Sequence, residues 1–180
     1  MDTDGTQMKR ETIFSREPQK AYRYTLWRAW QQTGQKQNHF VMFIGLNPST
    51  ADQESDDLTV RRCVGFAKNW GYGALCITNL FAFRATSPKV MKQQNNPVGK
   101  HNLRHLIECG TQADLTVAAW GAAGVHRKQN TFVLEKLSEK GINLFHLGLT
   151  KHGHPRHPLY LKADAKPKLF KPRKDGRYEQ

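Results

Sequence analysis

The stretch Val41-Met42-Phe43-Ile44-Gly45-Leu46-Asn47-Pro48-Ser49-Thr50 decides the fold, because an apolar run ends there in a polar corner. The hydrophobic run from Phe40 to Ile44 is typical of a strand that is buried on both faces of a parallel sheet. Gly45 permits a close approach of the backbone, and Pro48 fixes φ and ends the strand. In open α/β sheets, ligands bind just beyond the carboxyl ends of such strands. The corner is therefore a candidate ligand site, with an ordinary strand-to-loop turn as the alternative.

Buried strands and helices alternate after this corner. The hydrophobic pattern predicts strands at 74–78, 115–120 and 142–149 and helices at 58–70, 98–109 and 128–140. Asp56 or Asp57 suits the N-cap of the first helix. Glycines are expected to end the three helices, at positions 71, 110 and 141.

Two short strands precede the corner, at 11–15 and 21–30, with a turn at 17–20. Together with the later alternation they predict an α/β fold: a doubly wound, parallel four-stranded sheet with an N-terminal β-hairpin. The length of 180 residues fits one domain. We expect a flexible N-terminus at 1–10, the α/β domain at 11–162, and a basic, weakly structured C-terminal tail at 163–180.

The charge of the chain is one-sided, with 28 Lys and Arg against 15 Asp and Glu and a formal net charge of +13. Such a charge favours polyanionic partners, with nucleic acid first and an anionic membrane surface second. No apolar run is long enough to cross a membrane, and the N-terminus lacks the pattern of a signal peptide. We therefore expect a cytoplasmic monomer that has DNA as its partner and no membrane association.

The cysteines do not form a metal-binding pattern. Cys63, Cys76 and Cys109 lack CxxC spacing, and three thiols cannot supply the four ligands of a typical zinc or iron–sulfur site. His152, His154 and His157 lie in a loop broken by Gly and Pro, without a carboxylate or thiolate at ligand spacing. The sequence therefore predicts no metal site, no iron–sulfur cluster and no other cofactor.

Unusual polar residues follow three of the predicted strands: Asn47, Asn79 and the segment from His154 to His157. Parallel strands end at the same edge of a sheet, so these residues are expected to share one cleft. An Asn amide both donates and accepts hydrogen bonds, and it can therefore read the edge of a base or orient a water. A histidine can donate to charge that develops on a leaving group. Turn formation by the asparagines and a plain His-Pro loop remain the alternatives.

Several segments resemble the uncharacterised DUF1643 family over residues 20–162. They are Tyr22-Arg23-Tyr24, Gly45-Leu46-Asn47-Pro48-Ser49-Thr50-Ala51-Asp52, Asp57-Leu58-Thr59-Val60-Arg61-Arg62-Cys63, Asn79-Leu80-Phe81, Ala119-Trp120-Gly121 and His157-Pro158-Leu159-Tyr160-Leu161. The family name implies no activity.

The same landmarks are similar in order to those of the uracil-DNA glycosylase superfamily. Gly45-Leu46-Asn47-Pro48 resembles the corner whose third residue positions the attacking water, and Asn79 matches the residue that reads the edge of uracil. His157-Pro158-Leu159 resembles the loop in which His stabilises the departing base and Leu fills the space that it leaves. The resemblance implies a uracil-DNA-glycosylase-like fold.

The chain departs from that superfamily in several places. Asn47 stands where the most efficient members carry Asp, as in mismatch-type members, so its implied role is to hold a water. The last motif lacks Ser-Pro and has Tyr160, and a second register places His154-Pro155 on the motif. The four-cysteine cluster of some members is absent. The candidates for an aromatic residue that stacks on the base are Phe66, Phe81 and Phe83.

These observations lead us to expect a DNA glycosylase-like enzyme that hydrolyses the N-glycosidic bond of a damaged or modified base. The alternatives are a non-catalytic module that binds a modified base or nucleic acid, and a hydrolase of free nucleosides or nucleotides. The expected catalytic residues are Asn47, His157, Asp52 and Asp57. The expected base-binding residues are Asn79, Gly45, Leu46, Pro48 and Phe81. The expected DNA-binding residues are Ser49, Thr50, Arg61, Arg62, Arg84, Pro158, Leu159 and Tyr160.

Overall fold

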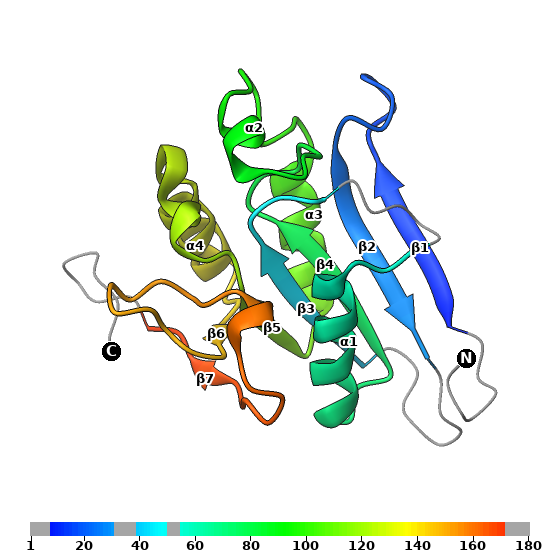
Figure 1. Ribbon diagram of the computed structural model, residues 1–180, viewed down its shortest axis with the longest axis vertical. Coiled ribbons are helices and arrows are strands. Elements are labelled where there is room, and N and C mark those ends of the chain that lie inside the picture. Colours follow the sequence, from blue (N-terminus) through cyan, green and yellow to red (C-terminus); the bar gives the residue numbers. More distant parts are fainter. Residues whose placement is uncertain (1–7, 31–38, 50–54, 172–180) are drawn as a thin grey trace.

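The computed structural model describes residues 8–30, 39–49 and 55–171, which form a mixed α/β protein (Figure 1). The strands are β1 (Lys9–Phe14), β2 (Arg23–Ala29), β3 (Phe40–Gly45), β4 (Ala74–Asn79), β5 (Leu115–Ala118), β6 (Leu144–His146) and β7 (Lys168–Leu169). The α-helices are α1 (Leu58–Asn69), α2 (Pro88–Lys92), α3 (Asn102–Gln112) and α4 (Gln129–Glu139). Two short 3₁₀ segments are η1 (Ala122–Lys128) and η2 (Pro158–Tyr160).

Within these residues the strands form one seven-stranded sheet in the order β1-β2-β4-β3-β5-β6-β7. The central strands β4, β3, β5 and β6 run parallel, as predicted. The prediction of a four-stranded sheet is wrong, because β2 pairs antiparallel with β4 and β7 pairs antiparallel with β6. The hairpin therefore extends the same sheet at one side, and the C-terminal segment extends it at the other.

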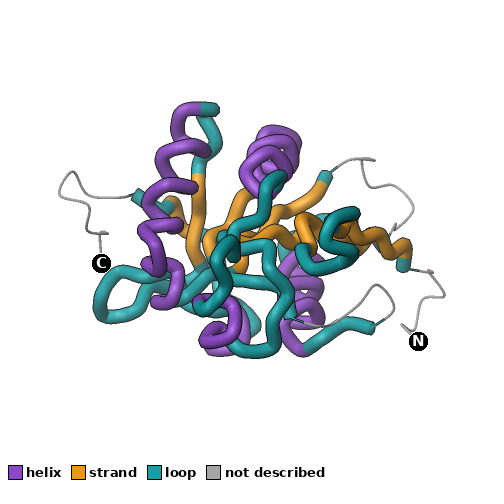
Figure 2. Tube along the Cα trace, turned by 90° about the horizontal axis from the view of Figure 1, so that it is seen from above, coloured by secondary structure: helices purple, strands orange, loops and turns teal. Residues whose placement is uncertain are grey.

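The two faces of the sheet are covered by different helices, as Figure 2 shows in a view along the layers. Val41 and Phe43 of β3 belong to the core under α1, with Val60 and Phe66. The alternate residues of the same strand, such as Ile44, pack in the other core with residues of α3 and α4. This period-two pattern explains why the apolar run of β3 has no polar residue on either face.

The predicted helix ends are correct for α1 but not for α3. Asp57 caps α1, accepting a hydrogen bond from the backbone N–H of Val60 at 2.8 Å. Gly110 does not end α3, which continues to Gln112. A Cβ on Gly110 would lie 3.2 Å from Cδ1 of Ile142, so this glycine permits close packing of the helix.

Part of the expected loose tail belongs to the folded core. Residues 168–169 form β7, and Phe170 is buried beside the rings of Trp120 and His146. The basic composition of 163–180 concealed this single apolar anchor. Residues 172–180 lie outside the described part of the chain. No described helix is long and apolar enough to cross a membrane.

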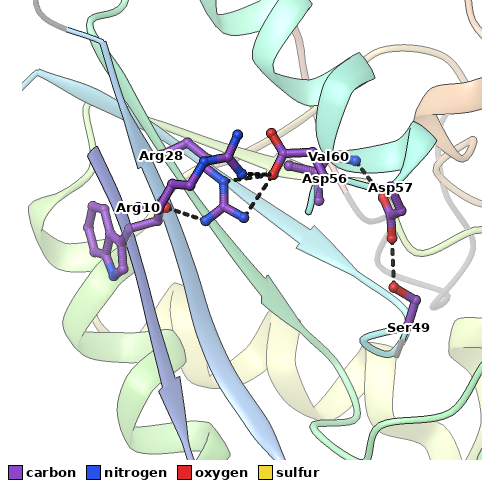
Figure 3. A network of polar contacts seen from close by, with 7 residues as sticks. Arg10, Arg28, Ser49, Asp56, Asp57 and Val60 are labelled. Atoms are coloured by element: carbon purple, nitrogen blue, oxygen red, sulfur yellow. Dashed lines mark hydrogen bonds and ion pairs between the residues drawn. The ribbon is translucent and has the colours of Figure 1, made fainter. Parts of the chain in front are cut away.

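A buried ion-pair network joins the hairpin to the start of α1 (Figure 3). The guanidinium of Arg28, on β2, is fully buried, and both Nε and Nη2 lie 2.8 Å from Oδ1 of Asp56. The same oxygen accepts from Nη1 of Arg10, on β1, at 2.8 Å. Asp56 precedes the N-cap residue Asp57, so the network fixes where α1 begins.

Asp56→Asn is expected to lower the free energy of unfolding by about 3–5 kcal/mol, because it leaves the charge of Arg28 buried without its carboxylate. Urea unfolding measures this loss. The matched control is Glu108→Gln, which breaks the exposed pair with Arg104 and should change little. Adding Arg28→Met to Asp56→Asn should recover part of the loss. Equal effects of Asp56→Asn and Glu108→Gln would contradict the prediction.

Candidate functional site

A cavity of about 230 Å³ lies at the carboxyl ends of β3, β4 and β5. The corner after β3 contributes Leu46, Asn47 and Ser49, and the end of β4 contributes Asn79. The cavity is closed by Asp57 and Thr59 at the start of α1, by Pro88, and by His157 and Pro158 at the start of η2. The three polar corners named from the sequence therefore meet in one place.

The side chain of Asn47 is oriented by two backbone carbonyls. Its Nδ2 donates to the carbonyl oxygens of Pro48 at 3.1 Å and Ala85 at 2.8 Å. A carbonyl cannot donate, so the amide nitrogen must face these partners and Oδ1 must face away from them. Oδ1 accepts no hydrogen bond from the described residues, and this leaves it able to accept one from a water or a ligand.

Asn79 lines the cavity and carries a buried hydrogen-bond donor. The residue is 3% exposed, and its Nδ2 has no hydrogen-bond partner among the described residues. Such groups are uncommon in folded proteins, because an unmade hydrogen bond in a buried site costs about 1–3 kcal/mol. The backbone around it is firmly held, since Nδ2 of Asn102 donates to the carbonyls of Asn79 and Leu80 at 2.9 and 3.1 Å.

Gly45 makes room for the Asn79 amide. A Cβ on Gly45 would lie 2.7 Å from Oδ1 of Asn79, which is closer than real Cβ contacts allow. The glycine of the Gly-Leu-Asn-Pro corner is therefore explained by this contact between neighbouring strands, which are in register at Gly45 and Asn79.

The sequence left open whether His154 or His157 matches the last motif, and the structure brings His157 to the cavity. His157 and Pro158 line it, whereas His154 does not. Nδ1 of His157 accepts from the backbone N–H of Leu159 at 3.3 Å, so the neutral ring carries its proton on Nε2. Burial lowers the pKa of His157, and the charge of Asp57 opposes that shift. The neutral ring is therefore a donor through Nε2.

Asp57 places a carboxylate among the other cavity groups. Oδ1 caps α1, and Oδ2 accepts from the hydroxyl of Ser49 at 2.6 Å (Figure 3). The Asp57 charge also acts on Arg23, which is 3% exposed. Burial lowers the pKa of Arg23 to about 10 while Asp57 raises it, so the guanidinium stays charged at neutral pH. The cavity thus holds a positive and a negative group together.

The sequence-based selection missed several cavity residues. Arg23, Phe43, Cys63 and Trp120 all line the cavity. Arg23 lies between Tyr22 and Tyr24 in a strand whose successive residues face opposite sides of the sheet. This alternation could have identified Arg23 as a charged residue that faces the interior. Burial raises the pKa of the Cys63 thiol, which makes it a neutral group rather than a nucleophile.

The proposed base-stacking residues do not line the cavity. Phe81, Phe83 and Phe66 are absent from its wall. Phe81 is fully buried and packs 5.6 Å from the ring of His126. Phe43 and Trp120 supply the aromatic rings there instead.

Of the proposed DNA-binding residues that the structure describes, Ser49 and Pro158 line the cavity and the others do not. Arg62 donates to the carbonyl of Leu161 and stacks on Phe66, and Arg84 stacks on Phe14. Both guanidinium groups therefore have structural contacts. Arg61, Leu159 and Tyr160 are exposed. Thr50 and Asp52 lie outside the described residues.

The geometry defines an α/β protein with a small cavity, lined by both polar and apolar residues, at the carboxyl edge of its parallel strands. The chain belongs to the family described as "Protein of unknown function (DUF1643)", whose sequence model matches residues 23–159, and this confirms the predicted family. No curated protein and no solved structure matches the chain. In the described residues, no group of three or more His, Cys, Asp or Glu side chains is arranged to hold a metal ion.

His157 is expected to protonate below its ordinary pKa of about 6.5, with the Nε2–H tautomer present above that pH. As the pH falls below about 6.5 the unfolded chain takes up this proton first, so folding stability declines down to the lowered folded-state pKa. NMR titration of the ring nitrogens measures both features. An Nδ1–H tautomer, or protonation above pH 6.5, would contradict the described hydrogen bond and burial.

Proposed function

We propose that this protein is a DNA glycosylase-like enzyme, hydrolysing the N-glycosidic bond of a damaged or modified base. The buried, unpartnered Nδ2 of Asn79 is the observation that carries the proposal. A buried donor beside a cavity is explained if a ligand supplies the acceptor, and the edge of a nucleobase offers carbonyl and ring-nitrogen acceptors. The resemblance of the Asn47, Asn79 and His157 segments to glycosylase motifs supports the same conclusion.

The size of the cavity favours a single base over a larger molecule. Its volume of about 230 Å³ is below the range of about 300–1,000 Å³ that drug-sized ligands occupy. A base in duplex DNA reaches such a cavity by leaving the stack, which costs a few kcal/mol and least for a damaged or mispaired base. Phe43 and Trp120 lie in the cavity wall, and both side chains are almost fully buried.

Three polar groups have properties that suit the hydrolytic step. Oδ1 of Asn47 accepts a hydrogen bond from the attacking water, and it orients that water without removing its proton. The Nε2–H of neutral His157 donates to negative charge that develops on the departing base. The carboxylate of Asp57 stabilises positive charge on the sugar.

Two alternatives use the same cavity. A non-catalytic module that binds a modified base is favoured by two of the described cavity residues, since Asn47 is an amide and the carboxylate of Asp57 already accepts two hydrogen bonds. A hydrolase of free nucleosides or nucleotides is the other alternative, and the strongly positive charge of the chain counts against it.

Wild type should form alkali-labile abasic sites in at least one DNA of a panel that contains uracil, hypoxanthine, mismatches and naturally modified phage genomes. Asn47→Ala and Asn79→Ala should each reduce turnover by about 100-fold or more, since single polar contacts to reacting groups typically contribute that much. Asn143→Ala, an exposed position, is the matched control. Binding without abasic sites on any DNA would favour the binding module, and full turnover by Asn47→Ala would remove its assigned role.

Gly45→Ala should lower turnover nearly as much as Asn79→Ala, because its Cβ displaces the Asn79 amide. The control is Gly65→Ala on α1, where a Cβ has no atom within 4 Å. Thermal unfolding distinguishes a shifted side chain from a damaged fold, and Gly45→Ala should remain cooperatively folded. Unchanged turnover by folded Gly45→Ala would count against base recognition by Asn79.

A further inference from the structure

Acidic residues are distributed unevenly over the two edges of the parallel strands. The segments 80–101, 119–128 and 147–163, which follow β4, β5 and β6, contain no Asp or Glu. At the opposite edge, Glu108 and Glu139 lie in the last turns of α3 and α4, and Asp114 precedes β5. These three segments therefore carry only cationic charges, whereas Asp57, at the start of α1, contributes a carboxylate to the cavity.

Three lysines lie on α2 and η1, the segments that begin at or just after the cavity residues Pro88 and Trp120, and we call these lysines the lysine rim: Lys89, Lys92 and Lys128. Lys89 and Lys92 are on α2, whose first residue, Pro88, lines the cavity. The segment η1 carries Lys128 and is held against the loop after α2, where Arg127 donates to the carbonyls of Gln94 at 2.8 Å and Asn95 at 2.9 Å. All three lysines are exposed.

Internal packing does not explain the charges of the lysine rim. No carboxylate in the described residues pairs with these three ammonium groups, whereas Lys136 and Arg104 elsewhere on the surface are paired with glutamates. Lys128 is the N-cap residue of α4, and cations are disfavoured at a helix N-terminus. Burial lowers the pKa of neighbouring His126, and the positive charges of Arg127 and Lys92 lower it further. An external anion would relieve this repulsion.

We propose that the lysine rim binds consecutive phosphates of the DNA strand that supplies the base to the cavity. The identification of the polyanion as DNA rests on the proposed function, but phosphate binding itself does not require hydrolysis. DNA is favoured over an anionic membrane because α2, which carries two of the three lysines, begins at a cavity of the size of a base. The rim fixes the position of the strand, and it reads no base.

The test compares two triple variants of the full chain that lose the same charge. The first is Lys89→Gln, Lys92→Gln and Lys128→Gln. The control is Lys9→Gln, Lys140→Gln and Lys166→Gln, all exposed positions. Lys140 directly follows the last residue of α4. Lys9 lies opposite Ala29 in the sheet, and Ala29 lies opposite Ala74, the first residue of β4. Lys166 adjoins Ala165, whose carbonyl accepts from Trp70 at the end of α1. All three controls therefore lie toward the edge opposite the cavity.

The affinity of each protein for an undamaged DNA duplex is measured over a range of salt concentrations, with circular dichroism as a check of folding. Each phosphate contact contributes about 0.9 to the slope of log affinity against log salt, so the rim variant should lose up to about three units of slope. The control variant should keep the wild-type slope. Equal slopes for all three proteins would overturn the inference.

Two further readouts separate this inference from the proposed function. If the rim variant shows a smaller salt dependence of DNA binding and wild type forms no abasic sites, phosphate binding by the rim is supported and hydrolysis is not. Abasic sites from wild type with an unchanged slope in the rim variant would support hydrolysis and overturn the rim. If the rim variant lost binding to phosphatidylserine vesicles but bound DNA like wild type, the inference would also be overturned, in favour of a membrane surface as the partner.

Discussion

The buried bond between Arg28 and Asp56 is the constraint on which the site depends. A guanidinium without solvent contact needs a carboxylate beside it, and Asp56 fulfils this need while also binding Arg10. The next residue, Asp57, starts α1 and reaches the cavity. One charge pair thereby sets the position of a helix, of a cavity carboxylate and of the hairpin that carries Arg23. The N-terminal hairpin is consequently part of the site's support rather than an appendage.

Much of the fold follows from local patterns in the sequence. The apolar run of β3, the helical spacing after Leu58 and the capping residue Asp57 are local features, and they predicted the parallel centre and the start of α1. The three polar corners were predictable as neighbours because parallel strands end at one edge. Their meeting at one cavity follows from strand direction, without knowledge of any side-chain contact.

The remaining features depend on contacts between distant residues, which local patterns do not encode. Phe170 was concealed by a basic segment, and Gly110 was taken for a helix end although it serves close packing against Ile142. Arg23 reaches the cavity because β2 pairs with β4, a pairing that no spacing in the sequence specifies. The orientation of the Asn47 amide likewise depends on the carbonyl of Ala85, in the loop after another strand.

The stretch of chain matched by the family model coincides with the stretch that forms the cavity. Its wall begins in sequence with Arg23 and ends with Pro158, and the family model spans residues 23–159. The strands β1 and β7 lie outside that span, and they are also the two outermost strands of the sheet. Exposed sheet edges invite pairing between molecules, and a very short edge strand such as β7, with two residues, limits that pairing. The family match thus covers the part of the chain that encloses the cavity, and the two edge strands of the sheet lie outside it.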